Sequence, residues 1–170
     1  ILLDLIDDKL KIPVKRQGYL DMYNGINVHQ TRHYIKISFT LFIYNVFIKH
    51  LETWMKSAYP SPPRSTPLQS DATWQKNVNA AVGNPDPKHQ SKLAKEMQLG
   101  YRSGVGELIW AMTTCRPDLA FASVKRSQSK SCPHELHYHG LKHTLKYLYH
   151  TKDDGLYFWR TAPRMELPEG

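Results

Sequence analysis

The residues best able to do chemistry fall into three groups: a pair of carboxylates, a set of cysteines and histidines, and a stripe of basic side chains. Asp7 and Asp8 are adjacent, as are carboxylates that hold two metal ions for nucleotidyl transfer. They lie in a segment with helical spacing rather than in a hairpin. We therefore predict that they are not a catalytic pair, and we expect no catalytic residue in this chain.

The cysteines and histidines raise the question of zinc, which favours these ligands at fixed spacing. The set is Cys115, Cys132, His134, His137, His139 and His143. No Cys-x-x-Cys motif occurs, and on a helix His139 and His143 point away from the direction of His137. We predict no metal site, and a zinc-dependent module stays an alternative.

The basic stripe belongs to a helix that we predict from Pro133 to about His150, with Ser131 or Cys132 as its cap. At about 100° per residue, one side of this helix is apolar. It carries Tyr138, Leu141, Leu145 and Leu148. The opposite side carries His139, Lys142, His143, Lys146 and His150. The first side predicts packing, and the second is either a solvated face or a contact with nucleic-acid backbone.

Composition agrees with a polyanion partner without identifying it. The net charge of +8 favours nucleic acid or an acidic membrane face, and the 11% aromatic residues offer surfaces for base stacking. The apolar run from Phe39 to Ile48 is shorter than the roughly 20 residues that span a bilayer, so we predict a buried helix or strand and no membrane partner. Two cysteines and no signal peptide predict an intracellular protein, in cytoplasm or nucleus and not secreted. Ile1 in place of Met suggests a fragment.

The N-terminal half predicts mixed structure. A short helix should end before Pro13, and even-numbered apolar steps from Leu20 to Ile37 indicate a β-hairpin. A helix from Thr40 to Lys56, capped by Ser38, should follow. Residues 57–98 hold six of the eleven prolines, so we predict a linker that is largely extended, mobile and partly disordered.

The C-terminal part predicts a bundle of about three helices that ends in a strand. The first helix follows Gly100, with Val105, Leu108, Ile109 and Met112 on one face. The second should run from Pro117 to Ser127 because proline suits the first turn. After the third helix, Leu156 to Arg160 should form the strand. The predicted fold class is therefore α+β.

Residues 99–160 contain a series of short motifs in a fixed order. The motifs are Tyr101-Arg102-Ser103, Gly106-Glu107-Leu108, Cys115-Arg116-Pro117-Asp118-Leu119, His137-Tyr138, Leu145-Lys146-Tyr147-Leu148 and Asp154-Gly155-Leu156-Tyr157. In order and spacing this series resembles the stretch just after the palm in copia-type retrotransposon reverse transcriptases.

The resemblance extends to the N-terminal part through Lys11-Ile12-Pro13-Val14-Lys15, Tyr23-Asn24-Gly25-Ile26 and Tyr34-Ile35-Lys36-Ile37. In that family a hairpin here, the primer grip, holds the primer strand. The resemblance implies that role for Met22, Tyr23, Asn24 and Gly25. Asn27 departs from the family, which tends to have an acidic residue there, and Phe39 to Ile48 is more apolar than a thumb helix.

The resemblance implies a division of the chain into the end of the palm (1–38), the start of the thumb (39–56), the linker (57–98), the helical thumb and connection (99–160) and a tail toward RNase H (161–170). It implies an RNA-directed DNA polymerase whose magnesium sites lie outside this fragment. The implied partners are an RNA or DNA primer–template duplex and the rest of the polyprotein, with its fingers, palm and RNase H. Met22, Tyr23, Asn24, Gly25, His139, Lys142, Lys146 and His150 are the predicted contacts. The alternative is a small basic helical nucleic-acid-binding or interaction protein unrelated to polymerases.

Overall fold

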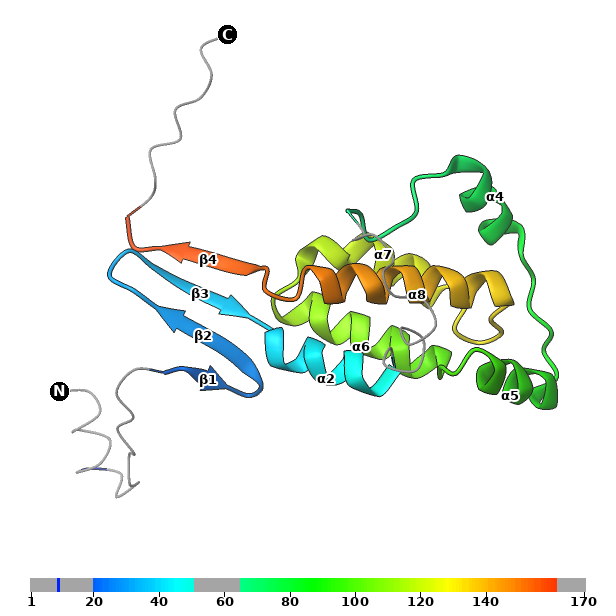
Figure 1. The fold of residues 1–170 in the computed structure, drawn as a ribbon, viewed down its shortest axis with the longest axis horizontal. Helices are drawn as coiled ribbons and strands as arrows, with labels where there is room; N and C mark the ends of the chain where they lie inside the picture. Colours follow the sequence, from blue (N-terminus) through cyan, green and yellow to red (C-terminus); the bar gives the residue numbers. More distant parts are fainter. Residues whose placement is uncertain (1–8, 10–19, 51–64, 162–170) are drawn as a thin grey trace, which may run out of the picture.

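The computed structural model describes residue 9 and residues 20–50 and 65–161. The predicted N-terminal helix, the Asp7-Asp8 pair and the part of the predicted thumb helix beyond His50 lie outside these residues. The described chain is α+β, as predicted: a four-stranded antiparallel sheet lies at one end of a helical region (Figure 1).

The sheet has the order β1-β2-β3-β4. Strands β1 (Met22–Tyr23), β2 (Ile26–Gln30) and β3 (Tyr34–Ser38) follow one another along the chain. Tyr23 pairs with Ile26, so only Asn24 and Gly25 connect β1 to β2. Both have positive φ angles, 49° and 80°, and the sequence Asn-Gly favours such a two-residue turn. Strands β2 and β3 pair from Asn27↔Ser38 to Gln30↔Ile35, which confirms the predicted hairpin, and the β1–β2 hairpin precedes it.

The fourth strand, β4 (Gly155–Trp159), comes from the other end of the described chain. It pairs with β3 from Tyr34↔Trp159 to Ser38↔Gly155. A strand was predicted here, but its partner was not. β4 is therefore the edge strand beside β3, and strands from both ends of the described chain belong to one sheet.

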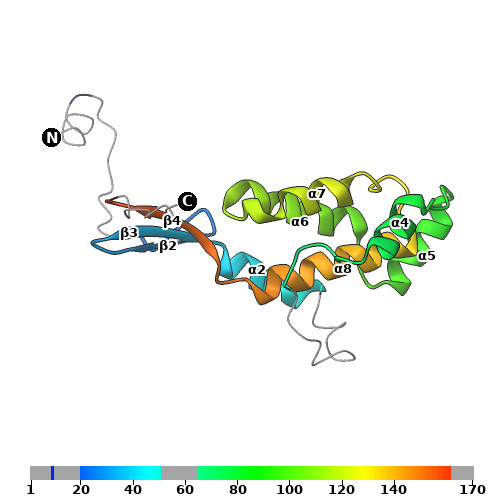
Figure 2. The same ribbon diagram turned by 90° about the horizontal axis from the view of Figure 1, so that it is seen from above.

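Six α-helices and one 3₁₀ helix form the remainder of the described residues. Their bounds are α2 (Thr40–His50), α4 (Ala72–Ala80), α5 (Pro87–Glu96), α6 (Tyr101–Thr114), η1 (Pro117–Leu119), α7 (Ala120–Ser127) and α8 (Glu135–His150). Seen from above, α2 and α8 lead out of the sheet, α6 and α7 lie in a second layer, and α4 and α5 lie at the far end (Figure 2). None of these helices is long and apolar enough to cross a membrane.

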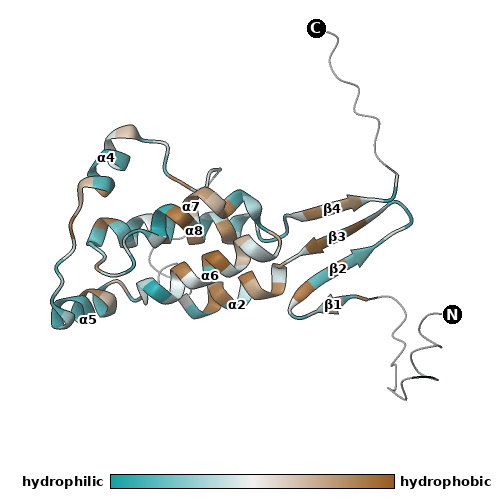
Figure 3. Cartoon of the chain, turned by 180° about the vertical axis from the view of Figure 1, so that it is seen from behind, coloured by the Kyte–Doolittle hydropathy of each residue, from teal (hydrophilic) through white to brown (hydrophobic). Residues whose placement is uncertain are grey.

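The core lies between α2, α6 and α8. The apolar side predicted for α8 is confirmed: Tyr138, Leu141, Leu145 and Leu148 are all buried. They pack with Phe39 and Ile43 at the start of α2 and with Val105 and Leu108 of α6. Ile109, predicted to share the α6 face, is instead exposed because it lies beyond the edge of the contact with α8. Figure 3 shows how α5 stays mostly hydrophilic while β3 and β4 carry apolar residues.

The predicted extended linker is wrong for residues 72–80 and 87–96, which form α4 and α5. Asp71 accepts hydrogen bonds from the amides of Thr73 and Trp74, and Asp86 likewise caps α5. Pro87 occupies the first turn of α5, where its missing N–H costs nothing. Buried Val78 and Leu93 anchor the two helices. The prolines thus start and separate helices here instead of preventing them.

The helix starts also differ in detail from the prediction. Pro117 opens a 3₁₀ turn before α7, and α8 is capped by His134 rather than Ser131 or Cys132. The amide of Leu136 donates to His134 Nδ1 (3.2 Å), and the amide of His134 donates to His137 Nδ1 (2.9 Å). In this capping box His134 takes the place of the usual Ser or Thr, and His137 takes the place of the usual Glu or Gln.

Candidate nucleic-acid interface

The hairpin residues Met22 and Tyr23 lie at the open edge of the sheet. Met22 is 47% exposed and Tyr23 is 66% exposed, while the positive φ of Gly25 keeps the turn tight. Asn27, which departs from the expected acidic residue, accepts a hydrogen bond through Oδ1 from the amide of Leu41 (3.3 Å). An acceptor at this position fixes the first turn of α2 against β2. The structure therefore brings Met22, Tyr23, Asn24 and Gly25 together, with Asn27 beside them as a structural residue.

One face of the sheet gathers aromatic rings, a histidine and a lysine. Directly paired residues of antiparallel strands share a face, so His29, Lys36 and Tyr157 lie in one row, and Tyr34 and Trp159 in the next. Tyr34 contacts both Tyr157 and Trp159 with ring centroids 5.3 Å apart, and Lys36 Nζ lies 5.3 Å from the centre of the Tyr157 ring. We call these five residues the aromatic face. Met22, paired with Asn27, lies on the same side.

The aromatic face is open and lacks negative charge. Tyr157 and Trp159 are 47% and 52% exposed, and none of the four strands contains Asp or Glu. The opposite side of the sheet carries Ile26 and Ile37, which pack against the core. Exposed rings beside cations offer stacking and charge together, the combination that single-stranded nucleic acid uses.

The sequence prediction missed the aromatic face because its rings come from β3 and β4, at opposite ends of the described chain. The alternation of Tyr157 and Trp159 was the available signal, since residues two apart on a strand share a face. The sequence did not show that β4 pairs with β3, so this alternation could not be connected with Tyr34 and Lys36.

The basic stripe on α8 is less open than predicted. His143 is buried, and its Nε2–H donates to the carbonyl of Thr66 (3.1 Å). Lys142, Lys146 and His150 are half-buried. Burial lowers the pKa of Lys142, and the charge of Lys146 lowers it further. His139 is exposed and lies 3.3 Å from Glu135 Oε1. The predicted contacts His139, Lys142, Lys146 and His150 therefore share one helix but differ in exposure.

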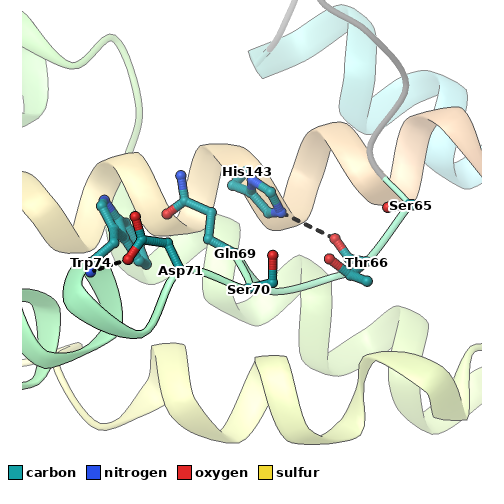
Figure 4. Close-up of a pocket in the computed structure, with 7 residues that line it drawn as sticks. All are labelled: Ser65, Thr66, Gln69, Ser70, Asp71, Trp74 and His143. Carbon is teal, nitrogen blue, oxygen red and sulfur yellow. Dashed lines mark hydrogen bonds between the residues drawn. The ribbon is translucent and has the colours of Figure 1, made fainter.

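The segment before α4 covers part of this helix and leaves a pocket of about 310 Å³ (Figure 4). The carbonyls of Thr66 and Pro67 accept hydrogen bonds from His143 and Thr144 of α8. The pocket lining is hydroxyl and amide groups from Ser65 to Ser70, with Asp71, Trp74 and His143. The Asp71 carboxylate in this lining accepts hydrogen bonds from the amides of Thr73 and Trp74, so it serves the start of α4.

The described residues contain no group of three His, Cys, Asp or Glu side chains that could hold a metal ion. These residues therefore offer no fitting ligand set for the magnesium ions that the resemblance implies. Cys115 and Cys132 are both free thiols. Burial raises the pKa of Cys115 to about 11, so it is protonated at neutral pH.

Comparison with known proteins gives one short similarity. Over 62 residues the chain is 43% identical to Secreted RxLR effector protein 161 of Plasmopara viticola, which is 36% of this chain and 44% of that protein. The matched stretch therefore spans less than half of this relative. No protein-family model matches the sequence, and no solved structure matches it significantly.

This similarity corrects the prediction of localisation. The chain was predicted to be intracellular and not secreted, but the similar protein is named a secreted effector. The prediction rested on cysteine content and on the apparent lack of a signal peptide. Neither feature by itself determines where a protein is delivered, so the prediction of an intracellular protein was wrong.

Proposed function

We propose that this chain binds nucleic acid, as a fragment of a copia-type reverse transcriptase that contributes primer–template binding and not the catalytic aspartates. The aromatic face carries the proposal, because it joins exposed rings, the cation Lys36 and the hairpin Met22–Gly25 on one sheet. Its partners would be a primer–template duplex and the remaining parts of the polymerase. The proposed contribution is grip on the primer–template and not nucleotidyl transfer.

The charge distribution supports this proposal. Arg32 and Arg160 lie at the end of the sheet where β2 turns into β3 and where β4 ends, and the amide of Arg160 donates to the carbonyl of His33 (2.9 Å). Lys142 and Lys146 add cations on α8. Cationic side chains supply most of the sequence-independent affinity for a phosphate backbone, and exposed rings add base stacking.

A second candidate is a small interaction protein that never belonged to a polymerase. The similarity to a secreted effector favours this class. Exposed apolar residues on α7, Phe121 and Val124, would suit a protein partner. The two candidates differ in what the aromatic face should do, because only the first requires it for nucleic-acid affinity.

Fluorescence anisotropy with a labelled primer–template duplex bearing a single-stranded overhang tests the proposal. Replacing Tyr157 and Trp159 by alanine should weaken binding at least tenfold, since stacking contributes about 1–3 kcal/mol per base. The matched control replaces Phe121 and Val124, which are exposed apolar residues outside the sheet, and should leave affinity unchanged. Unchanged affinity after the replacement of Tyr157 and Trp159 would favour the interaction protein.

The contribution of α8 is tested in the same assay by the salt dependence. Lys142→Glu with Lys146→Glu should weaken duplexes of different sequence by similar factors, and should reduce the salt slope by about one unit for each phosphate that the lysines neutralise. Lys88→Glu with Lys95→Glu makes the same charge change on α5 and serves as control. If the α5 variant reduces affinity as much, only the net charge matters and α8 is not a contact surface.

A further inference from the structure

Arg126 is a buried cation with no counterion in the part of the chain that the structure describes. It lies near the end of α7 and is only 3% exposed, yet its Nε and Nη2 atoms have no hydrogen-bond partner among the described residues. A buried charge of this kind is costly unless something pairs with it. Burial lowers the pKa of Arg126, and the nearby Tyr101 opposes the effect. The guanidinium must still carry its charge at neutral pH, because arginine does not lose its proton in proteins.

The surroundings hold the guanidinium in place without neutralising it. Its Cζ lies 5.7 Å from the centre of the Trp74 ring of α4. On the other side it lies against the backbone of α8 at Gly140, where an added Cβ would overlap Nη1 and Cζ. Glycine at this position therefore makes the space that the guanidinium occupies.

Arg126 lines a cavity of about 140 Å³ at the junction of α4, α6, α7 and α8. This is well above the roughly 10–15 Å³ that one water molecule needs. The lining residues include Gln75, Asn79, Lys125, Gln128 and Ser129, and none of them is acidic. His137 also faces the cavity, but its Nε2–H donates to the carbonyl of Val78 (3.0 Å). The cavity thus presents amide, hydroxyl and ammonium donors around an unpaired guanidinium.

A second arginine of the same chain shows what such a guanidinium binds. Arg116 is 2% exposed, and its Nε and Nη2 donate to Oδ1 and Oδ2 of Asp118 (2.9 and 2.8 Å). These are the same two atoms that lack partners in Arg126. Two donors on one edge of a guanidinium match two oxygens on one centre, as in a carboxylate or a phosphate.

We propose that the Arg126 cavity binds a small phosphoryl anion, with Nε and Nη2 of Arg126 donating to two of its oxygens. A phosphoryl group suits the cavity better than a carboxylate because it has more acceptor oxygens for the surrounding donors. The source is either free phosphate or the terminal phosphate of a larger molecule. This proposal does not depend on nucleic-acid binding at the aromatic face, which lies at the other end of the molecule (Figures 1 and 2).

Thermal unfolding at constant ionic strength tests the proposal, with inorganic phosphate replacing chloride. The Tm of the unmodified chain should rise with the logarithm of phosphate concentration, since a ligand that binds only the folded state stabilises it. Arg126→Met should lose this rise while keeping the aliphatic part of the side chain. Arg160→Met removes an exposed arginine at the end of the sheet and should keep the full rise.

A second variant and two further ligands complete the test. Gly140→Ala should displace the guanidinium and also lose the phosphate effect, even with Arg126 present. Acetate should raise the Tm less than phosphate. An oligonucleotide with a 5′-phosphate, compared with its 5′-hydroxyl form, identifies a terminal phosphate as the source if only the first shows Arg126-dependent binding. Equal phosphate shifts in the unmodified chain and in Arg126→Met would overturn the proposal.

Discussion

Two junctions of this molecule are each built around a buried arginine, Arg116 in one and Arg126 in the other. They differ in whether the chain itself pairs the buried charge. At the Arg116 junction, the guanidinium meets Asp118 and also donates to the carbonyl and hydroxyl of Thr151 (2.7 and 2.6 Å). Tyr147 completes this junction by donating to Asp118 Oδ2 (3.0 Å). At the Arg126 junction, the guanidinium meets an aromatic ring, a glycine and a cavity. At the first junction the described residues supply acceptors for the Arg116 guanidinium. At the second, Nε and Nη2 of Arg126 have no acceptor among the described residues.

The difference teaches how to separate a structural arginine from one that binds a ligand. The Arg116 junction ties the turn between α6 and α7 to the residue after α8, so its charge serves the fold. Burial by itself would raise the pKa of Asp118, but the hydrogen bonds and charge of Arg116 outweigh it and lower this pKa. Such a pair stabilises the fold above the ordinary pKa of aspartate and loses its effect as the pH falls through the lowered value.

Replacing each arginine by methionine is the strongest way to break the comparison. Arg116→Met should lower the free energy of unfolding by about 3 kcal/mol, because it removes four hydrogen bonds at a buried site. Arg126→Met should change it by no more than about 1 kcal/mol in phosphate-free buffer, and it can stabilise the chain, because it removes an unpaired buried charge. Urea unfolding followed by circular dichroism measures both. A larger loss in Arg126→Met than in Arg116→Met would reverse the assignment.

The features of the fold that depend on local spacing could be predicted from the sequence. The buried leucines of α8 follow from helical periodicity, and the β2–β3 hairpin follows from the alternating apolar residues between Leu20 and Ile37. The motif from Cys115 to Leu119 was visible too, but the sequence did not show that its Arg116 and Asp118 pair with each other. Local rules place a residue on an element and leave its partner undetermined.

The Arg126 cavity and the aromatic face could not be predicted because both depend on contacts between distant segments. Trp74 reaches Arg126 only because residues 72–80 form a helix, and the proline content of that region predicted a linker. Tyr157 reaches Tyr34 only through the pairing of β3 with β4. Two aspartate caps, Asp71 and Asp86, were the local signals for the missed helices.

The two cysteines give a smaller but direct test of the Arg116 junction, since Cys115 lies beside Arg116 and Cys132 lies outside both junctions. Cys115 precedes Arg116 and is buried, whereas Cys132 is half-buried in the loop before α8. Burial raises the pKa of Cys115 from 9.0 to about 11, which reduces its reactive thiolate about a hundredfold. In the folded protein a thiol reagent should therefore modify Cys132 first. Cys132→Ser should leave a chain that reacts slowly until urea unfolds it; fast reaction of Cys115 in the folded variant would mean that the Arg116 junction opens.

The smallest expected effect is a pH dependence at the Arg126 junction, through His137. Burial lowers the pKa of this histidine, its bond to the Val78 carbonyl opposes the shift, and the charges of His134 and Arg126 add to it. Between the lowered pKa and about 6.5, the unfolded chain binds more protons than the folded chain, so stability falls as the solution is acidified. The Tm in phosphate-free buffers should therefore decline below pH 6.5, and the Tm of His137→Gln should decline less than that of the unmodified chain.

His139→Gln, a change at an exposed histidine of the same helix, is the matched control and should follow the unmodified chain. Phosphate should reduce the decline, because a bound anion offsets the charge of Arg126 and makes protonation of His137 less costly in the folded state. The same decline in His137→Gln and in the unmodified chain would place the pH-sensitive group elsewhere and would separate His137 from the Arg126 junction.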